Sequence, residues 1–406
     1  MSNYSISILR EPKNIIPLIF FGYSIAYASG AAVNANSWAL LLITLFFSFF
    51  FLGWIFLRRS LKLKTIDALL ILDKRQAEIL KILSIFTVIV LMIYGIYKIS
   101  NVGWFNYFFV TRAARALLTR EDFLLSIFDD LIIGVFWLII SIDIFSNRKI
   151  TASTYSIAII ITIYSLLSIS LSTLVFVIIP FFVAKYWNIG TRYLTVVVGV
   201  MVLIVVAALW KPLLGSVFIG YSLSADDIKF PAEFTTWVDV YDNVSNAGGK
   251  WATMWYGESF ADTIKSLFFP LNKVESLSVL YSEQFEANVY EAGGGRGFSL
   301  PVEAYLNFKW VGVALIGFVS GMVLKFITLK ARKSVFYTFL FIACSALLFK
   351  LFRSESYSLL KNLVWLQIVP VLVLILSTKF MCSILLTKDG GRSTLRKNGL
   401  AKKDII

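Results

Sequence analysis

The stretch YSIAIIITIYSLLSISLSTLVFVIIPFFVAKYW, residues 155–187, decides how often the chain crosses a membrane. Its 33 residues are too many for one ordinary transmembrane helix and few for two, because a helix of about 20 residues spans the hydrocarbon core. The centre, from Ser165 to Thr173, is rich in Ser and Thr, and Pro180 would kink a second helix. We therefore predict two short spans here, joined by a turn.

The basic residues favour the same count. With two spans, segments 58–81, 146–154, 330–334 and 384–406 share the side of the N-terminus, and they carry 7, 2, 3 and 6 Lys or Arg. One span would place the last two segments outside, against the positive-inside rule. We predict both termini in the cytoplasm and about ten spans: 15–33, 37–57, 82–99, 123–145, 155–170, 171–187, 193–211, 301–329, 335–351 and 361–383.

Composition sets the fold class. Hydrophobic residues make up 58% of the 406 residues, charged residues 15%, and mean hydropathy is +0.80, whereas soluble proteins are about 25% charged. These values exclude a soluble enzyme and a disordered chain, and continuous apolar blocks exclude an outer-membrane barrel. The chain is predicted to be an all-α polytopic integral membrane protein. In a membrane protein, the net charge of +14 indicates which loops face the cytoplasm rather than a nucleic-acid partner.

Residue types that are missing or rare exclude several chemistries. The chain has no histidine, so imidazole bases, Ser-His-Asp triads and His-ligated metals are absent. Its two cysteines, Cys344 and Cys382, lie in apolar blocks, which argues against a disulfide-stapled loop or a Cys-rich metal site. We therefore expect no metal site and no cofactor.

The predicted organisation has four parts. Residues 1–211 hold seven spans and an Arg-bearing outer loop at 100–122, and residues 212–300 form a large outer loop between the seventh and eighth spans. Residues 301–383 hold three spans, and 384–406 form a basic cytoplasmic tail. The large loop carries eleven Asp or Glu against five Lys or Arg, with many aromatic residues. A loop of this length is functional or folds as a small unit, and a small hydrophobic core is the expectation for most of its rings.

Two basic clusters lie on the predicted outer side. Arg112 and Arg115 are one helical turn apart, and so are Lys350 and Arg353 in KLFRSESYS, residues 350–358. Arginine forks bind phosphate oxygens in bidentate fashion, so both clusters are candidate sites for a phosphate-bearing, lipid-linked ligand. The alternatives are an interfacial amphipathic helix for the first cluster, and membrane anchoring or a local ion pair for the second.

A third candidate is EAGGGRGFSLPVEAYLNFKWVG, residues 291–312. Glycines surround Arg296, and Gly lets backbone approach a ligand closely, although a flexible hinge explains them equally well. Ser299 is a predicted N-cap, with Pro301 in the first turn. Glu303 either stabilises the helix N-terminus or, at the outer rim of the membrane one turn from Asn307, acts as a general base.

Acidic residues inside a predicted span need their own weighing. Asp129, Asp130 and Asp143 lie in span 123–145, and acidic residues within a bilayer commonly have a functional role. A proton-coupled transporter would need such residues, but the glycine-bounded loop, the outer arginines and the lack of internal repeats favour a different class. A shallow, solvated position is the alternative for Asp129 and Asp130.

Three segments resemble the bacterial O-antigen polymerase family of Wzy-type enzymes. MWYGESFADTIKSLFFPLNKVES, residues 254–276, is similar to the family's Tyr-Gly, hydrophobic, Pro, Lys stretch in the large outer loop. GGGRGFSLPVEAYLNFKWVG is similar to its segment entering the next span, and FRSESYS carries the outer-rim arginine. Lys309 is a departure, because members commonly have Gly after the Asn-Phe pair.

The resemblance implies a GT-C-like glycosyltransferase in the bacterial inner membrane, with the large loop in the periplasm. The donor would be the growing chain on undecaprenyl diphosphate, and the acceptor a single lipid-linked repeat unit. Membrane lipids and a chain-length regulator protein are the other implied partners. Arginines would stabilise the departing diphosphate without a metal, and a carboxylate would take the hydroxyl proton. The residues carried over are Glu303 as general base; Arg296, Arg353, Arg112 and Arg115 for the diphosphate; and Tyr305, Asn307, Tyr256 and Lys273 for substrate.

Two other functions are the alternatives. O-antigen ligases use the same donor but rely on an outer-loop histidine, which this chain lacks. A flippase for lipid-linked glycans would have twelve or more spans with even loops. Glu303 also has competitors for the base among the loop acids, namely Asp226, Asp227, Glu258 and Glu291.

Overall fold

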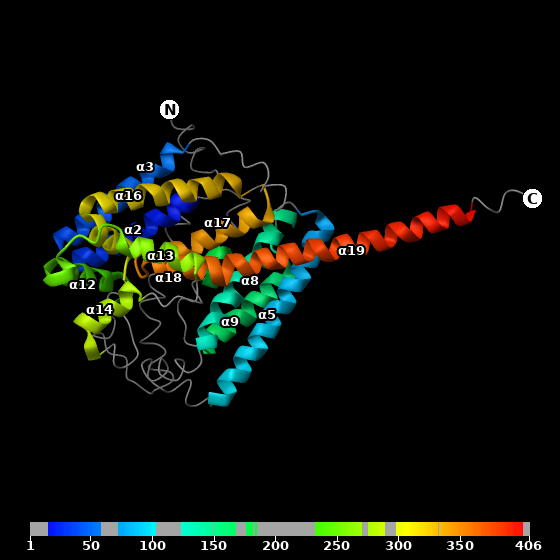
Figure 1. Ribbon diagram of the computed structural model, residues 1–406, viewed down its shortest axis with the longest axis horizontal. Coiled ribbons are helices and arrows are strands. Elements are labelled where there is room, and N and C mark those ends of the chain that lie inside the picture. Colours follow the sequence, from blue (N-terminus) through cyan, green and yellow to red (C-terminus); the bar gives the residue numbers. More distant parts are fainter. Residues whose placement is uncertain are drawn as a thin grey trace, which may run out of the picture.

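A computed structural model describes residues 15–57, 72–102, 123–147, 149–167, 176–181, 183–184, 232–269, 275–288, 298–331 and 333–400. All regular elements in these ranges are helices, which agrees with the predicted all-α class (Figure 1). Four stretches are long and apolar enough to cross a membrane: Ser37–Phe56, Lys74–Tyr97, Leu300–Lys330 and Ser356–Ile384. Shorter apolar helices accompany them at Ile19–Val33, Ala152–Tyr164 and Val335–Leu347.

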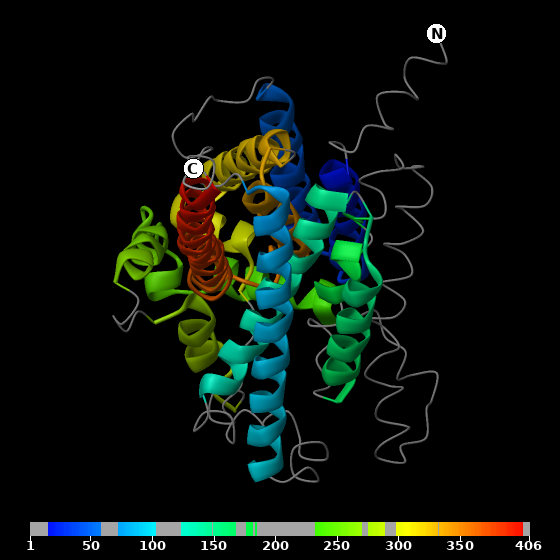
Figure 2. The ribbon, with the colours of Figure 1, turned by 90° about the vertical axis from the view of Figure 1, so that its right-hand side faces the viewer.

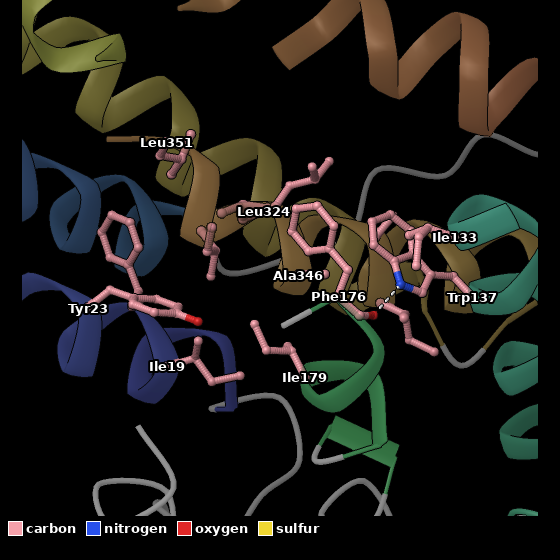
Figure 3. Close-up of a cluster of buried hydrophobic side chains, with 14 of the residues drawn as sticks. Ile19, Tyr23, Ile133, Trp137, Phe176, Ile179, Leu324, Ala346 and Leu351 are labelled. Atoms are coloured by element: carbon pink, nitrogen blue, oxygen red, sulfur yellow. Dashed lines mark hydrogen bonds between the residues drawn. The ribbon is translucent and has the colours of Figure 1, made fainter. Parts of the chain in front are cut away.

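The membrane part is built from the following helices: α2 (Ile15–Val33), α3 (Ser37–Phe56), α5 (Lys74–Val102), α8 (Phe123–Asn147), α9 (Ala152–Leu167), α16 (Leu300–Lys330), α17 (Val335–Leu347), α18 (Ser356–Lys361) and α19 (Val369–Leu400). Short 3₁₀ and π segments, η4 (Leu348–Lys350) and η5 (Asn362–Ile368), join the last of them. α5 runs alongside α8 (Figures 1 and 2). A buried apolar cluster ties the bundle together and includes Tyr23, Trp137, Leu324 and Leu351 (Figure 3).

α3 and α16 pack backbone against backbone through three glycines. A Cβ on Gly317 would lie 2.5 Å from the carbonyl oxygen of Phe46, and one on Gly321 would lie 2.0 Å from that of Phe50. Gly53 meets the Phe318 carbonyl oxygen in the same way, at 2.0 Å. Gly317 and Gly321 form a small-xxx-small motif, which allows membrane helices to approach closely.

The contacts between α3 and α16 also fix their relative direction. Residue numbers rise together along both helices: Trp38 meets Trp310, and Trp54 meets Lys325. The two helices are therefore parallel, which requires an even number of membrane crossings from one to the other. The predicted order of spans likewise makes the helices at 37–57 and 301–329 parallel.

The 155–187 stretch itself reverses direction as predicted. α9 ends at Leu167, and residues 176–181 are helical again. Tyr155, near the start of α9, stacks on Phe181 with ring centroids 5.3 Å apart, so the two ends of the stretch lie side by side. The indole N–H of Trp137 donates to the Phe176 carbonyl oxygen at 2.9 Å and ties the second segment to α8 (Figure 3). The predicted span 193–211 lies outside the described residues.

In the C-terminal region the helix begins earlier than the predicted span. Residues 352–360 were expected as an outer segment, but α18 begins at Ser356 and continues through η5 into α19. The membrane-length helix therefore starts five residues before the predicted 361, because the side chain of buried Glu303 caps its N-terminus. α19 extends to Leu400, so much of the predicted basic tail is helical (Figure 1).

The large loop contributes helices that pack on one end of the bundle. They are α12 (Ala232–Asn246), η3 (Gly249–Trp251), α13 (Glu258–Phe268) and α14 (Leu277–Phe285). Trp251 is buried and packs against the rings of Trp255, Tyr281 and Phe298, while its indole N–H donates to Gln284 at 2.7 Å. These rings form a small hydrophobic cluster, whereas Tyr256, Phe268 and Phe269 of the same loop are exposed.

The acids of α8 are held by neighbouring helices. Asp143 is fully buried, forms an ion pair with Lys81 of α5, and accepts from Thr154 at 2.6 Å. Asp129 accepts a hydrogen bond from the Tyr164 hydroxyl at 2.9 Å, and Asp130 lies 3.9 Å from the Lys350 ammonium. These contacts give all three acids partners between packed helices.

Candidate active site

The site is built around a short first arm of α16. Ser299 caps it by accepting from the Val302 N–H at 3.2 Å, and Pro301 lies in the first turn, as predicted. The arm ends at Phe308 and Lys309, whose backbone leaves the helical region. The N–H groups of Trp255 and Tyr256 donate to the carbonyls of Leu306 and Asn307, at 3.3 and 3.1 Å. The large loop thereby supplies the partners that the end of a helix needs.

Glu303 lies at the centre of a buried polar cluster. Its side chain is 1% exposed. Its Oε1 accepts hydrogen bonds from the hydroxyls of Ser259 and Ser356, both at 2.7 Å, and its Oε2 accepts from the Ser356 backbone N–H at 2.6 Å. The carboxylate therefore joins α13, α16 and α18, and it caps the start of α18 rather than of its own helix.

Asn307 and Thr263 extend this cluster. The Asn307 amide N–H groups donate to the Ser259 hydroxyl at 2.7 Å and to the Glu303 carbonyl at 2.9 Å. The Thr263 hydroxyl lies 2.8 Å from that of Ser356. Asn307 Oδ1 is buried and has no hydrogen-bond partner within the described part of the chain. An orphaned acceptor beside a carboxylate is unusual in a packed interior.

Glu355 is a second buried carboxylate next to this cluster. It accepts from the Ser278 backbone N–H at 2.7 Å and from the Ser358 hydroxyl at 2.9 Å. Burial raises the pKa of Glu355, while its hydrogen bonds act in the opposite direction. For KLFRSESYS, membrane anchoring and a local ion pair were the predicted alternatives to phosphate binding. The contact of Glu355 with α14 was not predicted.

An apolar groove opens beside the cluster, between α16, α17 and the start of α18. We call it the α16–α17 groove. Its volume is about 320 Å³, and its lining is almost entirely hydrocarbon, including Leu300, Leu324, Leu347 and Leu351. Ser356 is one of its two serines, and it also bonds Glu303. Ser356 therefore connects the apolar groove with a buried carboxylate.

The remaining predicted residues fall into two groups. Arg112, Arg115, Arg296 and Lys273 lie outside the described residues. Arg353 follows η4 in the turn before α18, and its backbone N–H donates a hydrogen bond to the Lys350 carbonyl oxygen at 2.9 Å. Lys350 itself faces Asp130 and the ring of Phe176.

The predicted substrate residues are distributed around the short arm. Asn307 shares the face of Glu303, whereas Tyr305 points toward α12 and contacts Tyr241 with ring centroids 5.3 Å apart. Tyr256 is 79% exposed and has a positive φ of 49°. The structure thus brings Glu303 and Asn307 together and places Tyr305 on the opposite side of the arm.

Sequence reasoning missed Ser259, Thr263 and Ser356. Ser356 stands within the quoted segment FRSESYS, but only the charged residues of that segment were weighed. Ser259 is 44 positions from Glu303, and no spacing rule relates the two. The small-xxx-small signal of Gly317 and Gly321 was also readable from sequence and was not used.

A comparison with protein families bears on this region. Residues 263–383 match the model of the family described as O-antigen polysaccharide polymerase Wzy. Comparisons with curated proteins and with solved structures gave no match. The matched residues include Thr263, Glu303, Asn307 and Ser356, and thus most of the buried cluster. Over residues 263–383 the chain is therefore similar to the O-antigen polysaccharide polymerase Wzy family, and this match implies the polymerisation of lipid-linked repeat units.

Proposed function

We propose that this chain transfers the growing glycan from undecaprenyl diphosphate to a single lipid-linked repeat unit at the periplasmic face of the inner membrane. An acceptor hydroxyl oxygen forms the new bond to the anomeric carbon of the donor. The bond from that carbon to the diphosphate oxygen breaks, and undecaprenyl diphosphate leaves with the electron pair. The hydroxyl proton passes to a base. Both termini lie in the cytoplasm, and a chain-length regulator protein is the proposed partner.

The α16–α17 groove is the observation that carries the proposal. A polyprenyl chain is pure hydrocarbon, and the groove offers it an apolar lining of leucines and valines. A polyprenyl chain in the membrane is already surrounded by hydrocarbon, so the groove would hold it by close packing rather than by removing apolar surface from water. Because Ser356 and Leu300 line it, a lipid seated there would present its head group to the Glu303 cluster.

The departing diphosphate carries negative charge, and arginines are the proposed groups that stabilise it. Arg353 lies two residues after Leu351 of the groove lining. Arg296 precedes the N-cap of α16 by three positions, and Arg112 and Arg115 are the further candidates. Preorganised cations aimed at developing charge are typically the largest single source of rate enhancement, so no metal is required in this proposal.

Glu303 is the proposed base, and Ser356 connects it with the groove. The carboxylate is enclosed, so the proton of the acceptor would reach it along the Ser356 hydroxyl, which already donates to Oε1 at 2.7 Å. Asn307, one turn away, is a proposed substrate contact, because its buried Oδ1 has no hydrogen-bond partner among the described residues. Tyr305, Tyr256 and Lys273 are proposed contacts for the glycan.

Deletion of the gene provides the test of the reaction. Loss of long chains from the lipopolysaccharide ladder with one repeat unit retained supports a polymerase, whereas loss of every repeat unit indicates a flippase or a ligase.

Ser356→Ala, expressed in the deletion strain, is expected to lose most polymer because the relay hydroxyl is gone, although the hydrogen bond from the backbone N–H to Glu303 stays. Thr263→Ala is the matched control: it removes a hydroxyl that bonds the same Ser356 oxygen but does not line the groove.

A further inference from the structure

Aromatic rings from three separate segments meet on the side of α16 away from the Glu303 cluster. Trp38, near the start of α3, lies 6.0 Å from Trp310 between ring centroids. Trp310 contacts Tyr305 edge to face at 5.3 Å, and Tyr305 contacts Tyr241 of α12 at the same distance. Tyr241 is buried, Tyr305 and Trp310 are half-buried, and Trp38 is 61% exposed. We call Trp38, Tyr305, Trp310 and Lys309 the aromatic platform.

Lys309 is held in this platform by a backbone that does not suit lysine. Its φ is 53° and its ψ is −144°, a region used almost only by glycine. The Lys309 ammonium lies 5.0 Å from the centroid of the Tyr305 ring. Residues kept in such conformations cluster at binding and catalytic sites. The hydrogen bonds from the Trp255 and Tyr256 N–H groups to the carbonyls of Leu306 and Asn307 hold the backbone in this conformation.

The rim of the platform is polar. The Asn36 side-chain amide donates to the Asp242 carboxylate, while its oxygen caps α3 by accepting from the Ala39 N–H at 2.8 Å. Asp242 and Asn36 are half-buried, so both are fixed yet reachable. The platform thus combines apolar ring faces, a cation and a fixed carboxylate within adjoining segments.

This combination matches the chemistry of a sugar ring. A pyranose has an apolar face of C–H groups and a rim of hydroxyls, so it needs flat apolar surface together with hydrogen-bonding groups. Trp and Tyr supply such surface and carry a polar atom of their own. Tryptophans at the membrane interface also serve as lipid anchors. The platform differs from an anchor because Tyr305 is covered by α12 of the large loop and adjoins charged groups.

We propose that the aromatic platform binds a sugar residue of the repeat-unit glycan and that Lys309 selects this sugar through its hydroxyl or anionic substituents. The inference rests on the proposed function and extends it to a glycan subsite. The subsite lies across the short arm of α16 from Glu303, since Tyr305 and Glu303 leave that arm on different sides. The lipid and the glycan would then occupy different faces of the same helix.

Direct binding to the purified full-length protein in detergent tests the proposal. The probe is the repeat-unit oligosaccharide of the host strain, released from its lipid by mild acid, so that no lipid or diphosphate contributes. Trp310→Ala and Trp38→Ala are each expected to weaken binding about five- to tenfold through the lost ring contact. Phe268→Ala is the matched control, because the Phe268 ring is 75% exposed and does not belong to the platform.

Lys309→Gly separates binding from stability. Glycine suits the φ of 53°, so the melting temperature is expected to stay equal or rise, while oligosaccharide binding weakens. Unchanged affinity in both Trp310→Ala and Lys309→Gly would overturn the proposal, as would wild-type protein that does not bind the oligosaccharide. Loss of quenching by brominated lipid in the Trp38→Ala and Trp310→Ala variants, together with unchanged sugar affinity in both, would establish a membrane anchor instead. The ladder of the deletion strain reports on polymerisation independently, so failure here leaves that result standing.

Discussion

The backbone N–H of Ser356 donates to Oε2 of Glu303 at 2.6 Å, across 53 positions of the chain. This bond joins the first turn of α16 to the first turn of α18. Ser356 also lines the apolar groove, so the same residue adjoins both the proposed lipid and the proposed base. The geometry explains why a carboxylate that is 1% exposed is still within one hydroxyl of the groove.

Glu303→Gln is expected to abolish polymer while the protein accumulates normally. The hydroxyls of Ser259 and Ser356 can rotate to accept from the new amide, so the cost in stability is about 1 kcal/mol. Proton transfer, worth about 10²–10⁴-fold in rate, would be lost. Lipopolysaccharide ladders and thermal unfolding of the purified variant measure the two effects. Wild-type ladders would reduce Glu303 to a structural cap and move the base to Asp226, Asp227, Glu258 or Glu291.

Arg353→Ala is expected to abolish polymerisation without loss of protein. Arg353→Lys should restore part of it, because lysine keeps the charge but lacks the bidentate fork. Arg296→Ala should behave in the same way, with smaller effects at Arg112 and Arg115. Ladder length at matched protein level is the measurement. Normal ladders in all four alanine variants would refute the arginine clamp.

Gly321→Ala is expected to destabilise the protein by about 1–3 kcal/mol or more, because its Cβ would lie 2.0 Å from the Phe50 carbonyl oxygen and backbone must move. Gly248→Ala is the control: a Cβ there has nothing within 4 Å. Thermal unfolding in detergent compares the two. Equal melting temperatures would show that α3 and α16 are not in backbone contact.

Cysteine labelling checks the orientation. Ser245 is exposed on α12, and the loop that carries it has a net charge of −6, five basic minus eleven acidic residues. In a chain with Cys344 and Cys382 replaced by Ala, Ser245→Cys should react with an impermeant reagent once the outer membrane is permeabilised. Protection until the inner membrane is broken would reverse the topology and place the site on the cytoplasmic side.

The sequence by itself determined the class of the protein and the course of most of its helices. Hydropathy predicted 15–33 and 37–57, and the structure places α2 and α3 there. The Ser/Thr-rich centre of 155–187 predicted a reversal that the stacking of Tyr155 on Phe181 bears out. Ser299 and Pro301 predicted the start of α16. These features are local: burial of an apolar run in lipid and the capping of α16 by Ser299 depend on neighbouring residues only.

Tertiary structure alone decided the site. Nothing in the order of residues states that Ser259 and Ser356 meet Glu303, because each pair is joined only when α13 and α18 fold onto α16. The break at Phe308 and Lys309 contains neither glycine nor proline, and it exists because the N–H groups of Trp255 and Tyr256 take the carbonyls that a straight helix would use itself. Long-range hydrogen bonds of this kind outweigh the local helix propensity of the residues, and they form only in the folded chain.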